Sequence, residues 1–179
     1  MRGFLRIAQN EDAVSKELGR FECKRDSDIE TFLRQQAIPY EKAHKSRTYL
    51  IVKSDSTRSM EIIGYFAVAL SNIKIPDGLS KSMKKKLGFT SKTEILPCYL
   101  IGQLGKNDLY WKDIEGRLLV DQAMNILLKG RELVGGKFVI VDCKDIDSVT
   151  TFYESNGFIR VQLDSERELV QFVRFLGKS

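Results

Sequence analysis

Hydrophobic residues recur with two different spacings along this chain. Apolar residues three or four apart, as on one face of a helix, predict helices at Asp26 to Gln36, Lys112 to Arg131 and Ile146 to Tyr153. The pair Gly135-Gly136 follows the second of these segments, and Asn156-Gly157 follows the third. Both pairs suit helix ends, because glycine and asparagine tolerate the left-handed conformation that commonly stops a helix.

Other segments are rich in β-branched and aromatic residues and predict strands. They comprise two hairpins, an irregular strand containing Pro97 and Gly102, and a continuous apolar run: 48–52 with 62–70, 158–163 with 169–175, 95–104, and 138–141. Between the first hairpin and the irregular strand, Ser71 to Thr93 is expected to leave the sheet, with a turn at Pro76-Asp77-Gly78 and a short basic amphipathic stretch. The chain is therefore expected to be an α/β protein, a mixed sheet with helices on both faces.

Length and composition indicate one globular domain. The 179 residues, 42% of them apolar, are enough to bury one substantial core, so we expect a single domain over residues 1–179. The first thirty residues lack the apolar core of a secretory signal, and no window reaches the roughly 18 apolar residues of a membrane span. We therefore expect a soluble, cytoplasmic protein with no membrane partner.

Cysteine and histidine are too few and too scattered for several kinds of site. Cys23, Cys98 and Cys143 are an odd number at wide spacing, and His44 is the one histidine. Neither a disulfide framework nor a metal site follows from this pattern, so the thiols are expected to be free in a reducing compartment. Nothing near His44 resembles the turn that presents a nucleophilic serine.

The net charge of +5 is modest, but the positive charge is concentrated. Five lysines crowd one short segment that otherwise contains mostly Ser, Gly and Thr: Lys81, Lys84, Lys85, Lys86 and Lys92. Such a run can be simply a solvated face. It can also contact an anionic partner such as RNA, because neutralising phosphates needs clustered cations but no particular sequence.

One segment near the C-terminus resembles a known family. Residues Asp145 to Phe158, DIDSVTTFYESNGF, are similar to the helix and turn of GNAT acetyltransferases, where a helix ending in FYxxxGF leads into the next strand. The resemblance implies a GNAT fold with a splayed strand in its sheet. It also implies that Tyr153 is the general acid that protonates the departing thiolate of coenzyme A, which suits a phenol that is protonated at pH 7. A half-buried tyrosine in a helix interface is the alternative.

The segment Tyr99 to Asn107 resembles the GNAT strand whose backbone pairs with pantetheine. Acetyl-CoA, the cofactor that the resemblance implies, would therefore contact Leu104, Gly105 and Lys106. The family's pyrophosphate loop, Q/R-x-x-G-x-G/A at a helix N-terminus, falls on residues 111–116 of this chain. Gly116 agrees with that pattern.

Two positions of this loop depart from the family pattern. Trp111 stands where Gln or Arg is expected, and Ile114 stands where glycine is expected, so its side chain is expected to obstruct the diphosphate. Asp113 and Glu115 add negative charge at the same place. Lys112 and Arg117, which we also assign to cofactor binding, are expected to offset that charge.

The N-terminal half resembles one branch of the family, the toxin-type GNAT enzymes. Those proteins share an F-x-C opening, a helix of the form LxxYLRxQA, an ART-F/Y strand and a GYY/F strand. The corresponding segments here are 21–23, 28–36, 46–52 and 63–66. Members of that branch acetylate the α-amino group of aminoacyl-tRNA, and many are neutralised by a small DNA-binding antitoxin.

The resemblance implies an acetyl-CoA-dependent N-acetyltransferase whose acceptor is a primary amine, with aminoacyl-tRNA as the leading candidate. Its partners would then be acetyl-CoA, tRNA and an antitoxin protein, and a homodimer is one option for its assembly. Two alternatives stay open: a non-catalytic GNAT-like module that binds RNA or a protein, and an acetyltransferase for a small amine or a protein N-terminus.

Overall fold

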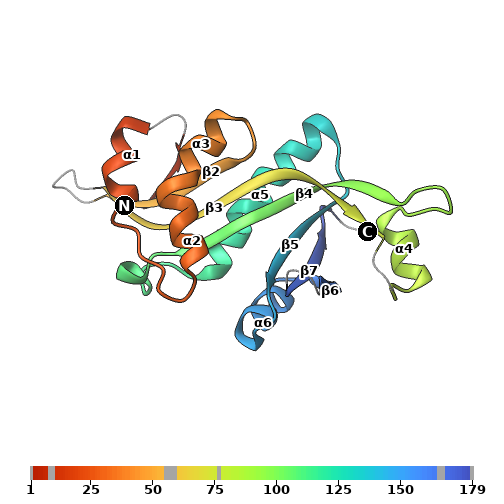
Figure 1. Cartoon of the computed structure of the whole chain (residues 1–179). Coiled ribbons are helices and arrows are strands. Elements are labelled where there is room, and N and C mark those ends of the chain that lie inside the picture. Colours follow the sequence, from red (N-terminus) through yellow and green to blue (C-terminus); the bar gives the residue numbers. More distant parts are fainter. Residues whose placement is uncertain (1, 8–10, 55–59, 76–77, 165–167, 178–179) are drawn as a thin grey trace. The chain divides into compact units, whose positions relative to one another are not determined.

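The computed structural model describes residues 2–7, 11–54, 60–75, 78–164 and 168–177 (Figure 1). Within these ranges the strands are β1 (Arg2–Arg6), β2 (Arg47–Ser54), β3 (Met60–Lys74), β4 (Ile95–Lys106), β5 (Phe138–Lys144), β6 (Ile159–Asp164) and β7 (Leu169–Phe175). The α-helices are α1 (Glu11–Leu18), α2 (Ser27–Thr31), α3 (Ala37–Lys42), α4 (Lys81–Leu87), α5 (Gly116–Val134) and α6 (Asp147–Ser155). A π-helical turn, η2 (Phe32–Gln36), joins α2 to α3, and a 3-10 turn, η3 (Asp108–Tyr110), follows β4.

The seven strands form one mixed sheet in the order β1-β2-β3-β4-β5-β7-β6. Strands β1, β2 and β3 pair antiparallel, as do β5, β7 and β6, whereas β4 and β5 run parallel. The parallel pairing covers Tyr99–Val139 and Leu100–Ile140, and β4 then continues to Lys106. This mixed sheet confirms the predicted fold class.

The described chain divides into two compact units that interleave in sequence. Unit 1 comprises residues 1–69 and 102–123, and unit 2 comprises residues 70–101 and 124–179. Strands β3 and β4 and helix α5 each contribute residues to both units. The expectation of a single domain stays a prediction.

The core of unit 1 lies between the N-terminal helices and the first strands. In Figure 1, α1, α2 and α3 gather beside β2 and the first half of β3. The fully buried side chains of this cluster include Val14 from α1, Phe21, Leu33 and Leu50 from β2. Strand β3 is buried without interruption from Ile62 to Val68, as expected for a central strand covered on both faces.

Neighbouring residues of β3 show which helices cover the two faces of the sheet in unit 1. A Cβ on Gly64 would meet the Leu119 side chain of α5 at 3.2 Å. The next residue, Tyr65, points to the opposite face, where its hydroxyl donates a hydrogen bond to the carbonyl of Ile29 in α2 at 2.6 Å. Helices therefore lie on both faces, as predicted.

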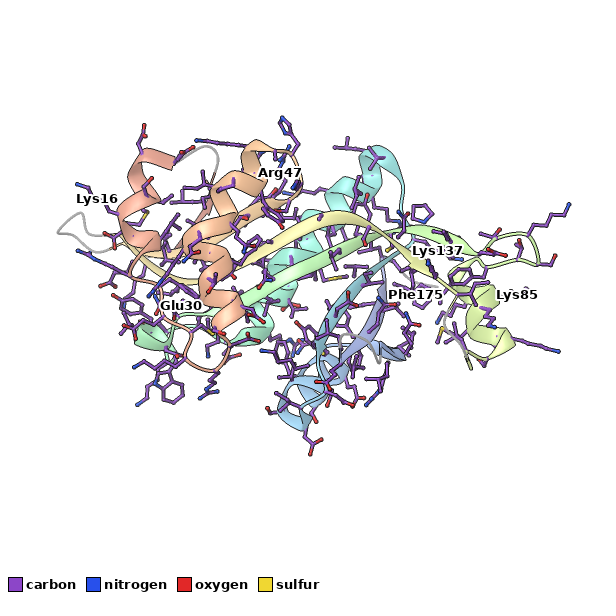
Figure 2. The ribbon with its side chains drawn as sticks, viewed as in Figure 1. Lys16, Glu30, Arg47, Lys85, Lys137 and Phe175 are labelled. Atoms are coloured by element: carbon purple, nitrogen blue, oxygen red, sulfur yellow. The ribbon has the colours of Figure 1, made fainter. Side chains whose placement is uncertain are left out.

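A buried carboxylate ties β1, α3 and β2 together. Glu41 is 3% exposed, and its Oε1 accepts hydrogen bonds from Nε and Nη2 of Arg6 at 2.9 and 2.8 Å. Its Oε2 accepts a hydrogen bond from the backbone N–H of Thr48 at 2.8 Å. The Nε of Arg47, a residue labelled in Figure 2, lies 3.6 Å from Oε1 of Glu41. Because a buried charge is costly unless it is paired, this network fixes the three elements to one another.

The predicted helix at Asp26 to Gln36 begins as expected but does not end there. The side chain of Asp26 caps α2 by accepting from the N–H of Asp28, and the helical path continues through η2 and α3 to Lys42. Pro39 lies in the first turn of α3, where its missing N–H costs little. The wider π-turn immediately before it accommodates the change.

The core of unit 2 is formed by the second part of the sheet and the helix α4. Its buried cluster includes Ile73, Leu87, Phe138, Val161 and Val173. The final hairpin of β6 and β7 confirms the prediction, and β7 also pairs along the whole of β5. All three cysteines of the chain are buried free thiols.

Several boundaries differ from the sequence-based expectation. The first hairpin is confirmed, but β3 continues to Lys74 instead of leaving the sheet at Ser71. The connection between the two strands of this hairpin and the predicted turn at 76–78 lie largely outside the described residues. Strand β1 and helix α1 were not predicted, because β1 carries arginine at both ends and α1 buries little besides Val14 and Leu18. Within the described residues, no helix has the length and apolarity to cross a membrane.

Candidate functional site

The end of β4 presents the first group of predicted cofactor contacts. Leu104 and Lys106 are half-buried, and Gly105 is buried between them. A Cβ on Gly105 would meet Cγ2 of Ile29 at 2.4 Å and the ring of Tyr65 at 3.1 Å. Glycine is therefore required here by packing, which allows α2 to approach the strand closely.

Asn107 fixes the chain where it leaves β4. Its amide nitrogen donates to the carbonyl of Ile62 at 2.7 Å, and its Oδ1 accepts from the N–H groups of Glu22 and Leu109 at 3.3 and 3.1 Å. The side chain is 2% exposed, so these bonds satisfy a buried polar group. Sequence analysis did not identify this role, although an asparagine between a strand and a tight turn is a usable signal.

The loop at 111–115 adopts a conformation different from the predicted one. Helix α5 begins at Gly116, four residues later than expected, because residues 107–113 form successive tight turns that include the bond from Asp113 N–H to the Tyr110 carbonyl at 2.8 Å. Ile114 is 2% exposed and is thus buried in unit 1. The side chain is therefore not presented to solvent at this loop, which argues against the expectation that it would obstruct a ligand there.

The charges at this loop are also paired differently from the expectation. Asp113 is paired with Lys53 of β2 and not with the predicted Lys112 or Arg117. The distance from Lys53 Nζ to Asp113 Oδ2 is 3.0 Å. Arg117 lies one residue into α5, 3.7 Å from Asp121 of the next turn. Lys112 is exposed, with its Nζ 5.3 Å from the ring centroid of Trp111. Lys112 and Arg117 are therefore exposed at the start of the helix. The charge of Asp113 is offset by Lys53, which lies in a strand far away in sequence.

Tyr153, the predicted general acid, lies in an aromatic cluster of unit 2. Its ring centroid is 5.3 Å from that of Phe152, 5.4 Å from Phe158 and 6.0 Å from Phe172. The residue is 9% exposed, and burial together with the neighbouring Cys143 thiol raises the pKa of its phenol well above the usual value. Tyr153 thus holds its proton at neutral pH.

The FYxxxGF letters correspond to a complete helix-ending motif. After α6, Gly157 has φ +77°, and its N–H donates to the carbonyl of Glu154 at 2.9 Å. The N–H of Phe158 donates to the carbonyl of Tyr153 at 3.1 Å, and the two rings are in contact. This is a Schellman turn with its hydrophobic contact, which explains why glycine is followed by an aromatic residue.

The basic segment forms α4 and the turn that follows it. Ser80 caps the helix by accepting from the N–H of Met83 at 3.2 Å, and Gly88 ends it with φ +109°. Four of the five predicted lysines are exposed and Lys84 is half-buried. Lys85 and Lys86 line a cavity, whereas Lys81, Lys84 and Lys92 do not.

The predicted site residues fall into the two units. The strand end at 104–106 and the loop with Lys112, Gly116 and Arg117 belong to unit 1. Tyr153 and the five lysines belong to unit 2. Sequence analysis did not identify Lys53 at the loop, or Arg131 and Lys137 beside Lys85 and Lys86, because all three come from segments distant in sequence.

Comparison with known proteins was made at the level of sequence and of structure. No family model matches the sequence, and no curated protein matches it. Solved structures align with nearly the whole chain at low sequence identity. A tyrosine-to-phenylalanine mutant of KacT is 21% identical with a TM-score of 0.75, covering 98% of this chain and 95% of that one.

Two structures of AtaT are similar in the same way. AtaT complexed with acetyl-methionyl-tRNAfMet is 22% identical with a TM-score of 0.75, covering 96% of this chain and 94% of that one. AtaTR bound with AcCoA is 20% identical with a TM-score of 0.70, covering 98% and 93%. The chain has the GNAT fold of these toxins. That likeness confirms the fold implied by the FYxxxGF segment.

Proposed function

We propose that this protein is an acetyl-CoA-dependent N-acetyltransferase whose acceptor is the α-amino group of aminoacyl-tRNA. The observation that carries the proposal is the GNAT fold shared over nearly the whole chain with AtaT, which has been solved both with AcCoA and with acetyl-methionyl-tRNAfMet. A second support is the position of Tyr153 in a complete FYxxxGF helix end. The fold alone does not specify a reaction, so the site residues must supply the chemistry.

The start of α5 fits the phosphates of coenzyme A. A helix N-terminus offers unpaired N–H groups to an anion, and α5 is 19 residues long. Ile114 is buried, and the charge of Asp113 is paired with Lys53. Lys112 and Arg117 stay exposed beside the exposed Glu115, and Arg117 Nε lies 3.7 Å from Asp121 Oδ2. In this proposal Gly116, Lys112 and Arg117 hold the diphosphate, and the backbone of Leu104, Gly105 and Lys106 orients the pantetheine arm.

Tyr153 supplies the proton in this proposal. When bound, acetyl-CoA provides an acetyl thioester, which the neutral acceptor amine attacks at its carbonyl carbon. As the carbon–sulfur bond breaks, Tyr153 would donate its phenolic proton to the leaving sulfur, and the proton that the acylated nitrogen gives up would return through water to the phenolate. The raised pKa keeps the phenol protonated before the step, but it also makes the phenol a weaker acid toward the departing sulfur, so the support for this role is the resemblance and not the pKa.

Replacing Tyr153 with phenylalanine tests this role. The Tyr153→Phe variant keeps the ring that contacts Phe152, Phe158 and Phe172 and loses one hydroxyl. We expect the rate of acetyl transfer to aminoacyl-tRNA to fall by about 10²- to 10⁴-fold, the usual contribution of a general acid. The matched control is Tyr40→Phe, which removes the hydroxyl of an exposed tyrosine and should leave the rate unchanged.

The outcomes separate the proposal from its alternatives. Calorimetric titration with acetyl-CoA should give saturable binding for the wild type and the same affinity for Tyr153→Phe. No binding by the wild type would favour the non-catalytic module. Equal rates for Tyr153→Phe and the wild type would remove Tyr153 from the mechanism, and transfer to small amines or peptide N-termini but not to aminoacyl-tRNA would replace the acceptor.

A paired antitoxin is the protein partner that this proposal implies. AtaT has been solved bound to the C-terminus of the antitoxin AtaR, and KacTA has been solved with DNA. Co-expression with the protein encoded beside this chain should relieve growth arrest caused by the wild type. Growth arrest that is as strong with Tyr153→Phe as with the wild type would separate toxicity from acetylation.

A further inference from the structure

Unit 2 contains a cavity lined by positive charge. Its volume is about 790 Å³, within the range of small-ligand sites. Its lining residues come from α4, the end of α5, the start of β5 and the end of β7: Ser82, Lys85, Lys86, Arg131, Gly136, Lys137, Phe175, Leu176 and Gly177. Four of the nine are cations, and none is a carboxylate.

Three of the four cations lie against different neighbouring residues. Lys86 Nζ lies 4.7 Å from the ring centroid of Phe175, as a cation–π pair. The guanidinium of Arg131 lies over Gly177, where a Cβ would meet its Nη1 at 2.4 Å. Lys137 Nζ lies 3.9 Å from the position of a Cβ on Gly88, at the end of α4. Figure 2 labels Lys85, Lys137 and Phe175.

No internal anion neutralises this group of charges. Within the described residues, none of the four cations forms an ion pair, in contrast to Arg34, Lys42 and Lys53, which all do. Four like charges around one cavity repel one another, and the repulsion is only partly relieved by solvent and salt. An anionic ligand would convert that repulsion into attraction, so the arrangement favours a bound anion.

The positive surface continues beyond the cavity. Lys81 and Lys84 lie on the same short helix as Lys85 and Lys86, and Lys92 lies in the turn that follows it. A single small anion would use only the cavity, whereas a chain of phosphates would use both the cavity and the helix beside it. We infer that this cavity binds the phosphate backbone of the RNA acceptor, an inference that rests on the proposed function.

Binding of uncharged tRNA, measured by fluorescence anisotropy across a salt series, tests the inference. The variant is Arg131→Gln with Lys137→Gln, which removes the two cations that lie outside the lysine run. The logarithm of the binding constant falls linearly with the logarithm of the salt concentration. Each lost phosphate contact makes this slope less steep by about 0.7 to 0.9, so loss of the pair should make it less steep by about 1.5. At 0.1 M salt this corresponds to binding about 30-fold weaker than that of the wild type.

Two further variants control for net charge and for structure. Lys16→Gln with Lys129→Gln removes the same charge from exposed lysines of α1 and α5 that do not line the cavity, and should weaken binding less than about threefold. Arg131→Lys with Lys137→Arg keeps both charges and should bind like the wild type. Equal weakening in the two Gln pairs, or no binding of tRNA by the wild type, would overturn the inference.

A titration of the same variants with acetyl-CoA separates the two sources of phosphate. The affinity for acetyl-CoA should be unchanged in Arg131→Gln with Lys137→Gln, and a parallel loss would assign the cavity to coenzyme A instead. The tRNA used carries no amino acid, and acetyl-CoA is omitted from the anisotropy series. The result therefore does not depend on catalysis. A protein that binds tRNA through this cavity but transfers no acetyl group would refute the proposed function alone.

Discussion

The close approach of α2 to the end of β4 makes Gly105→Ala a sharp test of the unit 1 core. The new methyl group would meet Cγ2 of Ile29 at 2.4 Å and the fully buried ring of Tyr65 at 3.1 Å. The first distance is below any real contact, so the short helix carrying Ile29 must move. Overpacking of this kind costs about 1–3 kcal/mol, and we expect a loss of about 2 kcal/mol in the free energy of unfolding.

Urea unfolding followed by circular dichroism gives this free energy directly, and a thermal scan should show a Tm about 4–8 °C lower. The control is Gly19→Ala, where the new methyl group would lie 3.7 Å from the carbonyl of Lys16 and the glycine has no positive φ. That variant should be neutral or slightly stabilising.

A double-mutant cycle identifies the residue that causes the loss. In an Ile29→Ala background the clashing Cγ2 is absent, so Gly105→Ala should cost less than about 1 kcal/mol. An equal cost in both backgrounds would refute the assignment of the clash to Ile29. No loss of stability in the single variant would refute the close packing of α2 on β4.

Two predictions concern unit 2. Gly157→Ala should lower the free energy of unfolding by about 1 kcal/mol, because φ is +77° there; an unchanged urea midpoint would contradict the left-handed turn. Burial, with the charge of Asp142, raises the pKa of Cys98 to about 12 and of Cys143 to about 11. Thiols of the unfolded chain ionise at lower pH, so stability should fall as pH rises from about 9 toward 11, and a flat profile would contradict this.

The sequence was informative where local chemistry and packing agree. Alternating and β-branched residues defined both hairpins, and the glycine after α6 marked a real left-handed helix end. The FYxxxGF residues that carry the resemblance to GNAT enzymes also specify a Schellman turn, so they predict the fold more strongly than the chemistry. For that reason Tyr153 stays a prediction until its hydroxyl is removed.

The start of α5 could not be predicted because a buried loop residue imitated a helical one. Ile114 and Leu118 are four residues apart, which matches the spacing of one helix face, yet Ile114 precedes the helix and is buried independently of it. Periodicity records which side chains are buried and not which backbone conformation buries them. The turns from Asn107 to Asp113 depend on the buried amide of Asn107, whose partners at 22 and 62 are remote in sequence.

The cationic cavity could not be predicted from the sequence, because its lining residues come from segments far apart along the chain. The lysine run suggested a contiguous patch, but only Lys85 and Lys86 of that run line the cavity, and Arg131 and Lys137 join them from about 50 residues away. A charge cluster of this kind is made by the topology of β5, β7 and α4. The sequence around an exposed arginine or lysine does not indicate which other cations lie beside it in the folded protein.

The loop before α5 departs from the sequence pattern of a pyrophosphate loop. Two positions of the pyrophosphate pattern are lost, yet that pattern exists to present free N–H groups and to keep bulk and negative charge away from an anion. Here Ile114 is buried and Lys53 pairs with Asp113, whereas Glu115 stays exposed. Part of the loop's physical role can therefore be retained when its sequence pattern is not, which is why we propose this helix start as the site for the phosphates of coenzyme A.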